Sequence, residues 1–398
     1  MPDANIVKFR RPDPAAGGTN AVAGSSTSAA GPPCGPALEV RDLTVSRGGA
    51  FDLRIKHLSV AVGETLAVLG LNGAGKSTLL ETLALLVKPD AGEVRVLGEV
   101  ARGGKSRHRL RRRLGLALQD PFLLRRSVLD NVALPLRLRG IAPSEARARA
   151  GAWLERFGIP HLAGRPAREV SGGEARRASL ARALVTDPDL LLLDEPFSAL
   201  DPPTRDALLR DFQKALGPGT AVILVTHDRA EALDLAQQVA VLHAGRLLQQ
   251  GPTQEVFRRP ANEVVASIVG LESILTGPVI ASEGGVCRVQ VAQDVTIEAA
   301  AEGEPGARLT LCIHPEEVTI ERSGPPARST ARNVFPAFIR SITPHGRGCR
   351  VELECPFPLV ALVTRQSVED LALRAGERVT ASFKASAVHV FPARNPIP

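Results

Sequence analysis

The sequence predicts a large α/β domain with a largely parallel sheet, interrupted by a helical insertion and followed by a smaller all-β domain. From 37 to about 269, short apolar segments alternate with longer helical stretches, a pattern typical of a sheet covered by helices. Helices dominate between 127 and 170, so we expect a helical subdomain at about 121–175. After about 271, short alternating strands with Gly and Pro turns predict an OB-like β domain.

The composition of each region indicates where the domains begin and end. The chain has 398 residues, 44% of them hydrophobic, which is enough for more than one buried core. Residues 1–36 are rich in Ala, Gly, Ser and Pro and carry few large apolar side chains, so we expect a disordered tail. The α/β domain is expected over 37–270 and the β domain over 271–398. We expect neither a signal peptide nor a membrane span, because no apolar run approaches about 20 residues.

Charge and cysteine content narrow the function classes. The net charge is +7, but the basic residues are scattered apart from the run at 102–113, which we interpret as a solvated helix face rather than a nucleic-acid site. The five cysteines are widely spaced and form no C-x-x-C pair, which indicates a reducing compartment and no zinc site. Cys349 and Cys355 are expected on a hairpin rather than at a metal.

Individual strands are predicted where apolar residues run without interruption, because strands of a parallel sheet are covered on both faces. In the α/β domain these strands lie at 66–69, 114–118, 190–193 and 221–225. Helices are predicted at 77–87 and 143–157. In the β domain, strands are predicted at 287–291, 309–313, 338–342, 349–353 and 379–383. Two stretches of similar length, 272–322 and 329–393, suggest two OB-like halves.

The strongest motif is a glycine-rich loop between the strand at 66–69 and the helix at 77–87. Its residues are Gly70-Leu71-Asn72-Gly73-Ala74-Gly75-Lys76-Ser77-Thr78, a complete P-loop. The glycines let successive backbone N–H groups point at phosphates, and the helix dipole adds positive potential. We expect Lys76 to contact the β- and γ-phosphates and Ser77 to ligate Mg²⁺. ATP and Mg²⁺ are therefore the expected cofactors.

Two further segments carry residues suited to phosphate chemistry. The apolar strand at 190–193 ends in Asp194 and Glu195. The packing of a buried strand does not require carboxylates at its end. We therefore expect Asp194 to help hold Mg²⁺ and Glu195 to polarise the attacking water. The run Ser171-Gly172-Gly173-Glu174 precedes a predicted helix at 175–184 and provides a second helix N-terminus that can bind an anion.

The run at 171–177, Ser-Gly-Gly-Glu-Ala-Arg-Arg, resembles the signature sequence of ABC ATPases. The other motifs of that family are present in their usual order: Gln119 as the Q-loop, Ser198-Ala199-Leu200-Asp201 as the D-loop, and His227 as the switch histidine. The resemblance covers about 37–265, and it implies the P-loop NTPase fold of an ABC ATPase.

The resemblance also implies a mechanism and partners. Two copies would pack head to tail, with each ATP between the P-loop of one copy and Ser171, Gly172 and Gly173 of the other, near Asp201. Gln119 and His227 would sense the γ-phosphate, and Gln119 would be a further Mg²⁺ ligand. The segment 120–138 would receive the coupling helices of transmembrane permease subunits. The protein would then hydrolyse ATP at the cytoplasmic face of the inner membrane to drive import, with a substrate-binding protein as an indirect partner and no nucleic acid.

Two positions depart from the family pattern. The signature ends in Glu174 where the family usually has glutamine, a change that we expect to be tolerated. ABC ATPases commonly place an aromatic residue at the position of Arg47 to stack on adenine, and this chain has no tyrosine. We expect Arg47 to stack through its planar guanidinium, with nearby Phe51 as the alternative.

Residues 272–398 resemble the transport-associated OB (TOBE) domain of ABC importers. The stretches 329–333 (Ser-Thr-Ala-Arg-Asn) and 384–389 (Lys-Ala-Ser-Ala-Val-His) resemble motifs of molybdate-binding, Mop-type domains. This implies a regulatory site for molybdate or tungstate between subunits. Its hydroxyls and cations would come from Thr330, Arg332, Lys384 and Ser386. The alternative is that these residues serve only the fold.

Other functions compete with an oxyanion importer. The ATPase of a sulfate, iron, polyamine or sugar importer would share everything up to about 270. A non-transport ABC protein in translation or DNA repair would typically carry two ATPase domains or a long coiled-coil insertion, and neither is seen. A regulatory oxyanion-binding protein would need a DNA-reading module, which residues 1–36 cannot provide.

Overall fold

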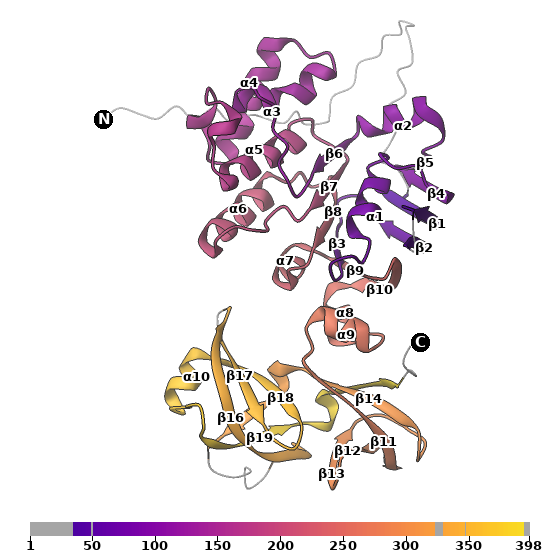
Figure 1. The fold of residues 1–398 in the computed structure, drawn as a ribbon, viewed down its shortest axis with the longest axis vertical. Helices are drawn as coiled ribbons and strands as arrows, with labels where there is room; N and C mark the ends of the chain where they lie inside the picture. Colours follow the sequence, from indigo (N-terminus) through magenta and orange to yellow (C-terminus); the bar gives the residue numbers. More distant parts are fainter. Residues whose placement is uncertain (1–34, 49–50, 323–328, 347, 394–398) are drawn as a thin grey trace, which may run out of the picture. The chain divides into compact units, whose positions relative to one another are not determined.

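The computed structural model describes residues 35–48, 51–322, 329–346 and 348–393. One ten-stranded sheet with helices and two smaller five-stranded sheets make up this part of the chain (Figure 1). The tail expected at 1–36 lies, up to residue 34, outside the described residues. None of the described helices is both long enough and apolar enough to cross a bilayer.

The large sheet has the strand order β5-β4-β1-β2-β10-β9-β3-β8-β7-β6. Its strands are β1 (Leu38–Ser46), β2 (Asp52–Val60), β3 (Thr65–Leu69), β4 (Ala91–Val96), β5 (Glu99–Val100), β6 (Leu114–Ala117), β7 (Leu190–Asp194), β8 (Ala221–Thr226), β9 (Gln238–His243) and β10 (Arg246–Pro252). Strands β9, β3, β8, β7 and β6 are parallel, whereas β1, β2, β4 and β5 pair antiparallel. The sheet is therefore mixed, and the expectation of a largely parallel sheet holds only for the half that contains the P-loop. The first strands alternate buried and exposed residues, as antiparallel strands with one wet face do.

The four strands predicted from apolar runs are confirmed to within one residue at each end, as β3, β6, β7 and β8. Every residue of β7 is buried, and alternate side chains join different cores. Leu190 and Leu192 pack into the cluster that contains α1, whereas Leu191 and Leu193 pack into the cluster that contains α5 and α6. Coverage on both faces explains the unbroken apolar runs.

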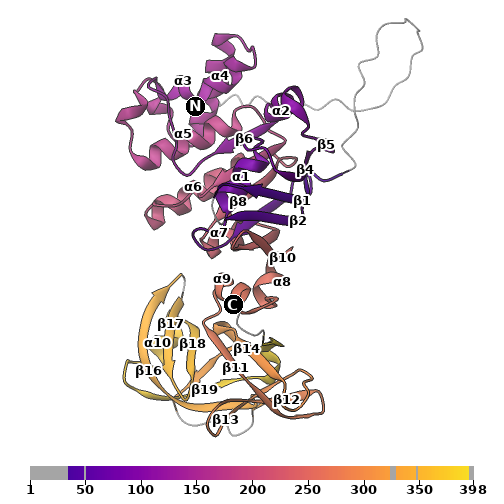
Figure 2. The ribbon, with the colours of Figure 1, turned by 45° about the vertical axis from the view of Figure 1, so that its right-hand side comes forward.

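The helices of this region are α1 (Lys76–Leu83), α2 (Gly103–Arg111), α3 (Val128–Leu138), α4 (Pro143–Arg156), α5 (Gly172–Leu184), α6 (Pro202–Ala215), α7 (Arg229–Leu235), α8 (Thr253–Arg258) and α9 (Glu263–Val269). The predicted helical insertion is present as α3, α4 and two short 3₁₀ turns, Pro160–Leu162 and Ala167–Glu169. Figure 2 shows α3 and α4 beside α5, and the hydrophobic cluster that they share confirms this packing.

One helix prediction was too long. The helix expected at 77–87 ends at Leu83, and Leu85 has a left-handed φ of 59°. Pro89 follows shortly after, and the residue before a proline avoids helical backbone. The basic run at 102–113 forms α2 and the turn after it. Its exposed charges confirm a solvated face, because Leu110 is the buried residue of this helix.

The C-terminal strands form two antiparallel sheets, β13-β12-β11-β14-β20 and β15-β19-β16-β17-β18. Their bounds are β11 (Ser273–Glu283), β12 (Val286–Ala292), β13 (Val295–Ala299), β14 (Arg308–Ile313), β15 (Thr319–Glu321), β16 (Asn333–His345), β17 (Gly348–Glu354), β18 (Pro358–Thr364), β19 (Arg378–Phe383) and β20 (Val388–Pro392), with one helix, α10 (Arg365–Asp370), and two 3₁₀ turns, Pro315–Glu317 and Ala385–Ala387. All five strands predicted for this region are confirmed. Two five-stranded sheets are present, as the two stretches of similar length suggested, but each includes one strand from the other stretch, because β15 pairs with β19 and β20 pairs with β14. The halves exchange edge strands and share one hydrophobic core.

Cys349 and Cys355 lie on a hairpin of β17 and β18, as expected, and both thiols are free. Cys349 lies on β17, and Cys355 lies in the turn before β18, where its thiol contacts the Phe357 carbonyl at 3.0 Å. Among the described residues, no group of three or more His, Cys, Asp or Glu side chains is arranged to hold a metal ion.

Candidate nucleotide-binding site

The P-loop forms the turn from β3 into α1, and two of its glycines, Gly70 and Gly75, are sterically required. A Cβ at Gly70 would lie 2.3 Å from the Leu242 carbonyl oxygen. Gly75 has a φ of +102°, and a Cβ there would lie 2.7 Å from Cζ of Phe51. Gly75 is also the N-cap of α1 and supplies no side-chain cap, so the first backbone N–H groups of the helix stay open to an anion.

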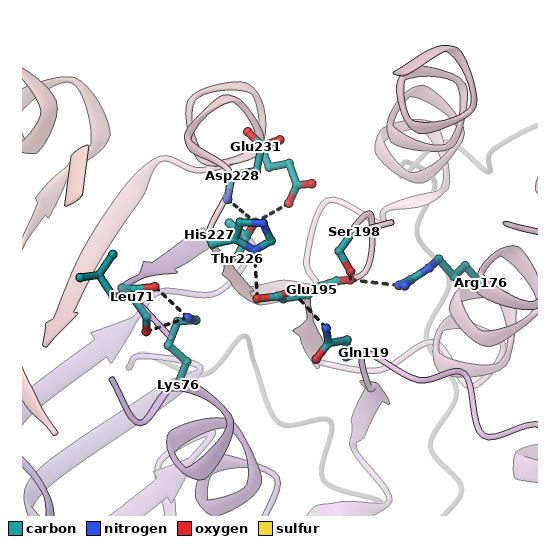
Figure 3. Close-up of polar contacts among 11 residues, drawn as sticks. Leu71, Lys76, Gln119, Arg176, Glu195, Ser198, Thr226, His227, Asp228 and Glu231 are labelled. Atoms are coloured by element: carbon teal, nitrogen blue, oxygen red, sulfur yellow. Dashed lines mark hydrogen bonds and ion pairs between the residues drawn. The ribbon is translucent and has the colours of Figure 1, made fainter. Parts of the chain in front are cut away.

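Lys76 is held at the loop by backbone oxygens (Figure 3). Its ammonium donates to the carbonyl of Gly70 at 2.7 Å and to that of Leu71 at 3.2 Å. The side chain is 7% exposed, and burial lowers the pKa of Lys76, while Glu195 and Asp194 oppose that shift. A phosphate oxygen could replace these carbonyls as the partner of the ammonium.

Oxygen donors suited to Mg²⁺ lie beside the P-loop. Asp194 ends β7 and is 7% exposed; burial raises its pKa, and the hydroxyl of Ser77 opposes the rise. Gln119 follows β6 and lines the same cavity as these two residues. A hydroxyl, a carboxylate and an amide oxygen are hard donors of the kind that Mg²⁺ prefers. The residues present therefore fit the expected metal.

Glu195 connects the two candidate γ-phosphate sensors. The Gln119 amide donates to one carboxylate oxygen at 3.3 Å, and Nδ1 of His227 lies 3.0 Å from the other oxygen. Glu195 itself has a left-handed φ of 44°, a conformation that costs on the order of 1–3 kcal/mol in a non-glycine residue. The carboxylate lies between Gln119 and His227 (Figure 3).

The backbone of Glu195 is fixed from three directions. Its N–H donates to the Val225 carbonyl of the neighbouring strand at 2.9 Å. Its carbonyl accepts from the Ser198 hydroxyl at 2.9 Å and from the Arg176 guanidinium at 3.1 Å. Ser198 belongs to the D-loop and Arg176 to the first turns of α5. The strained residue is therefore supported by elements on either side of it.

These residues surround one cavity of about 870 Å³. Its walls comprise the end of β3, the P-loop, the acids and sensors named above and three residues from other elements: Leu69, Gly70 to Thr78, Gln119, Asp194, Glu195, His227, Phe51, Arg229 and Ile268. The predicted P-loop residues, Mg²⁺ ligands and sensors thus lie together in space.

The two candidates for the adenine contact are placed differently. Arg47 pairs with Glu81 of α1, and it is not among the described residues that line the cavity. Phe51 does line it, and its ring lies against Gly75. The arrangement therefore favours the alternative aromatic residue over Arg47.

The signature residues lie outside this cavity in the described part of the chain. Ser171 is the N-cap of α5, and its hydroxyl accepts from the Glu174 N–H at 3.4 Å. The Glu174 carboxylate accepts in turn from the N–H and the hydroxyl of Ser171, at 2.7 and 2.8 Å. Asp201 caps α6 and is likewise exposed, away from the P-loop. Within one copy of the chain, neither the run 171–173 nor Asp201 lies at the P-loop.

The predicted oxyanion residues meet at one end of the second C-terminal sheet. β16 and β19 pair with Asn333 opposite Phe383, which brings the stretch with Thr330 and Arg332 beside the stretch with Lys384 and Ser386. All four residues are exposed, and Arg332 lies 3.9 Å from Glu298. Asn333 is buried, and its side chain pairs with both the N–H and the carbonyl of Glu298 at 2.8 Å. One residue of the Mop-like motif therefore has a structural role, whereas the candidate ligands point to solvent.

Sequence patterns alone missed two contributors to the nucleotide site, Arg176 and Arg229. Arg176 lies five residues after Ser171 on α5, so helical spacing could have indicated a side chain returning toward the strand ends. Arg229 follows the switch histidine by two residues and lines the cavity with Ile268 of α9. No spacing rule connects two segments 39 residues apart.

Comparison with known proteins places both regions in families. A family model described as ABC transporter matches residues 53–198, and a TOBE domain model matches residues 329–390. The chain is 38% identical over 345 residues to the molybdate/tungstate import ATP-binding protein WtpC of Pyrococcus horikoshii, covering 86% of this chain and 96% of that protein. It is 35% identical to the sulfate/thiosulfate import ATP-binding protein CysA of Mycolicibacterium paratuberculosis, covering 86% and 88%.

Solved structures agree for the first region. CbiO1 of Clostridium perfringens, part of an ABC transporter complex, matches with a TM-score of 0.52 and 30% identity, covering 60% of this chain and 95% of its own. A dimeric ATP-binding cassette, MJ0796, in a post-hydrolysis state with ADP and phosphate, matches with a TM-score of 0.50 and 27% identity, covering 54% of this chain and 98% of its own. The chain belongs to the family of import ATP-binding proteins of ABC transporters, and it is an ATPase.

Proposed function

We propose that this protein hydrolyses ATP in a head-to-tail dimer to drive the import of molybdate or tungstate through separate permease subunits. The observation that carries the catalytic part is the position of Glu195 between Gln119 and His227, at the wall of the P-loop cavity. The proposed oxyanion cargo is supported by the WtpC proteins, which match over both regions of the chain. In this proposal, residues 1–36 are a tail, 37–270 the ATPase domain and 271–398 a regulatory domain.

The cavity residues expected from the sequence have the following proposed roles. Lys76 and the P-loop N–H groups bind the β- and γ-phosphates, and Ser77, Asp194 and Gln119 hold Mg²⁺, which neutralises phosphate charge when bound. Glu195 orients and polarises the attacking water, because its carboxylate is fixed at the cavity wall. His227 and Gln119 respond to the γ-phosphate through the carboxylate that they share. Phe51, rather than Arg47, contacts the adenine.

The second copy completes the site in this proposal. Ser171, Gly172 and Gly173 lie at the exposed N-terminus of α5, where the helix dipole favours an anion. Their separation from the P-loop within one chain supports a role across a dimer interface, as does the dimeric cassette among the similar structures. Asp201 is proposed to lie at the same interface.

The segment 120–138 is the proposed contact with a permease at the cytoplasmic face of the membrane. Phe122 and Leu124 are 67% and 46% exposed. The backbone beside them is fixed by Arg182 of α5, which donates to the carbonyls of Pro121 at 2.7 Å and Phe122 at 3.0 Å. Exposed apolar side chains on a fixed backbone are suited to protein contact. A substrate-binding protein would take part only through the permease.

The cargo is tested by calorimetric titration of the full-length protein with tungstate, molybdate and sulfate. Binding of the first two with weak or no sulfate binding is expected, and Arg332→Ala and Lys384→Ala should abolish it. Arg340→Ala, an exposed arginine on strand β16, which begins directly after Arg332, serves as the matched control. If oxyanion binding survives Arg332→Ala and Lys384→Ala, these two side chains are not the ligands.

A sulfate importer is the second candidate, because the sulfate/thiosulfate relative also matches over 86% of the chain. The two candidates differ in the oxyanion that the assembled transporter should accumulate. Co-purified permease reconstituted in vesicles should accumulate tungstate or molybdate when ATP is supplied. Accumulation of sulfate instead, with no heat from tungstate, would replace the proposed cargo and leave the ATPase assignment unchanged.

A further inference from the structure

The segment that carries the switch histidine has charged residues for which phosphate chemistry gives no role. Beyond His227, the segment contains Asp228, Arg229 and Glu231. Two of them are bound close by. The Thr226 hydroxyl donates to the Glu231 carboxylate at 2.6 Å (Figure 3), and Asp228 pairs with Arg205 of α6. These contacts attach the segment to its own helix and to the helix that follows the D-loop.

Arg229 extends in another direction, to the carboxyl end of α9. Its Nε donates to the Ile268 carbonyl at 3.0 Å, and its Nη2 donates to the Ser267 carbonyl at 3.2 Å. The last carbonyls of a helix lack partners within the helix, and the negative end of the helix dipole favours a cation there. Arg229 is thus a side-chain cap supplied from 38 residues away in sequence.

Gly270 makes room for this cap. It follows the last residue of α9 with a φ of +98°, a conformation that favours glycine. A Cβ at Gly270 would lie 2.2 Å from Nη1 of Arg229, so the guanidinium occupies the space that a side chain would need. The glycine and the arginine therefore depend on each other.

This junction borders both the nucleotide cavity and the start of the C-terminal sheets. Arg229 and Ile268 line the cavity together with the P-loop and His227. Strand β11 begins at Ser273, three residues after Gly270. A displacement of the end of α9 would therefore be transmitted through Arg229 to the backbone beside His227.

We propose that Arg229 is a positioning residue that holds the switch-histidine segment against the carboxyl end of α9, so that ATP turnover depends on the junction where the C-terminal strands begin. The proposal rests on the role proposed above for His227. In this proposal Arg229 acts through the carbonyls of Ser267 and Ile268 rather than on the phosphates. It fixes the distance between His227 and the Glu195 carboxylate by fixing the segment that carries the histidine.

The test is a double-mutant cycle on the full-length protein with steady-state ATPase kinetics. Arg229→Ala should lower kcat about tenfold and leave KM for ATP within about twofold, because misplaced groups cost rate more than ground-state binding. Gly270→Ala should lower kcat to a similar extent by displacing the guanidinium. In the Arg229→Ala background, Gly270→Ala should have little further effect on kcat, although the strained backbone still lowers the unfolding midpoint. Arg210→Ala, an exposed arginine on α6, is the control.

Two outcomes would overturn the proposal: wild-type kcat in Arg229→Ala, or independent, multiplicative losses in the double variant. Arg229→Lys keeps a cation for the helix end and should restore part of the lost kcat, which guards against a variant that merely folds poorly. His227→Ala separates the two hypotheses. Wild-type kcat in that variant would refute the role of the histidine itself, whatever the cycle shows.

Discussion

The two helix N-termini proposed to face the phosphates of ATP, at α1 and α5, differ in how their backbone groups are satisfied. At α1 the N-cap is Gly75, which offers no side chain, so the first N–H groups remain open. At α5 the N-cap is Ser171, and Glu174 completes a reciprocal capping box with it. The first end is also partly buried beneath Phe51, whereas the second is exposed.

If both ends bind phosphate as proposed, one anion site leaves its helix without a side-chain cap, and the other has a cap that the anion would displace. The free N–H groups of α1 cost stability unless an anion binds, and the buried Lys76 adds charge to that end. The α5 end is capped within the chain, and in the proposed dimer a phosphate bound to a second copy would compete with the carboxylate of Glu174. The P-loop is therefore expected to dominate nucleotide affinity, and the signature to adjust dimer formation.

The largest effect is expected from a substitution that removes the catalytic carboxylate and leaves the N-termini of α1 and α5 unchanged. Glu195→Gln should lower ATP hydrolysis by at least about 100-fold, because the carboxylate that polarises water is lost. ATP affinity, measured by calorimetry, should stay near the wild-type value, and ATP-bound dimers should accumulate. Glu255→Gln, on the exposed face of α8, is the control. Hydrolysis close to the wild-type rate would exclude Glu195 as the catalytic carboxylate.

Matched glycine substitutions compare the two ends directly. Gly75→Ala should weaken ATP binding about tenfold or more, because the backbone is left-handed and Phe51 occupies the space. Gly172→Ala meets no atom within 4 Å and should leave ATP binding by the monomer unchanged. Equilibrium titration with a fluorescent ATP analogue measures both. Equal losses in the two variants would contradict the contrast between the ends.

A third comparison concerns the wall of the P-loop cavity. Phe51→Ala should weaken ATP binding several-fold, about 1 kcal/mol, since an aromatic face next to Gly75 is lost. Arg47→Ala should change it little, because its guanidinium is paired with Glu81 rather than placed in the cavity. Affinity for GTP tests whether the contact depends on the base. If Arg47→Ala were the more damaging substitution, the original expectation of arginine stacking would be restored.

The smallest effect is expected at the α5 end. Glu174→Gln keeps the length of the side chain but removes a negative charge near the proposed γ-phosphate, so ATP-driven dimerisation should tighten about threefold. Analytical ultracentrifugation in the Glu195→Gln background measures it. Weaker dimerisation would mean that the carboxylate helps rather than hinders.

The same substitution has a pH signature. Hydrogen bonds from Ser171 lower the pKa of Glu174, so the folded state favours the carboxylate. Its stabilising contribution is present above the ordinary pKa of a glutamate and is lost as the pH falls through the lowered value. Glu174→Gln should lack this contribution. The thermal unfolding midpoints of the wild type and Glu174→Gln should therefore differ less at low pH than at neutral pH.

Much of the nucleotide site could be predicted because its parts occur in contiguous motifs. The P-loop, Asp194 and Glu195 each follow an apolar strand, and parallel strands bring their carboxyl ends to one edge. Arg47 was the exception, because sequence position predicts a place near the adenine but not whether the side chain finds Glu81 first. The contact of Arg229 with α9 could not be predicted, since it depends on how a later helix packs.

In the C-terminal region, the individual strands could be predicted but their pairing could not. Alternating patterns predicted five strands correctly, because alternation records which side chains face the core. Pairing between strands leaves no such record, so the exchange of β15 and β20 between the halves was missed. The oxyanion residues were predicted from a resemblance, and the structure brings their two stretches together through the pairing of β16 with β19.

The exchange of edge strands has a consequence for biosynthesis. β14 lacks its partner on one side until β20, which ends at Pro392, has left the ribosome. The first C-terminal sheet therefore cannot be completed during translation of its own half, and its unpaired edge is exposed until residues 388–392 have emerged. Nascent chains stalled before Val388 should be cleaved by protease within 273–313, while the P-loop domain upstream is already resistant.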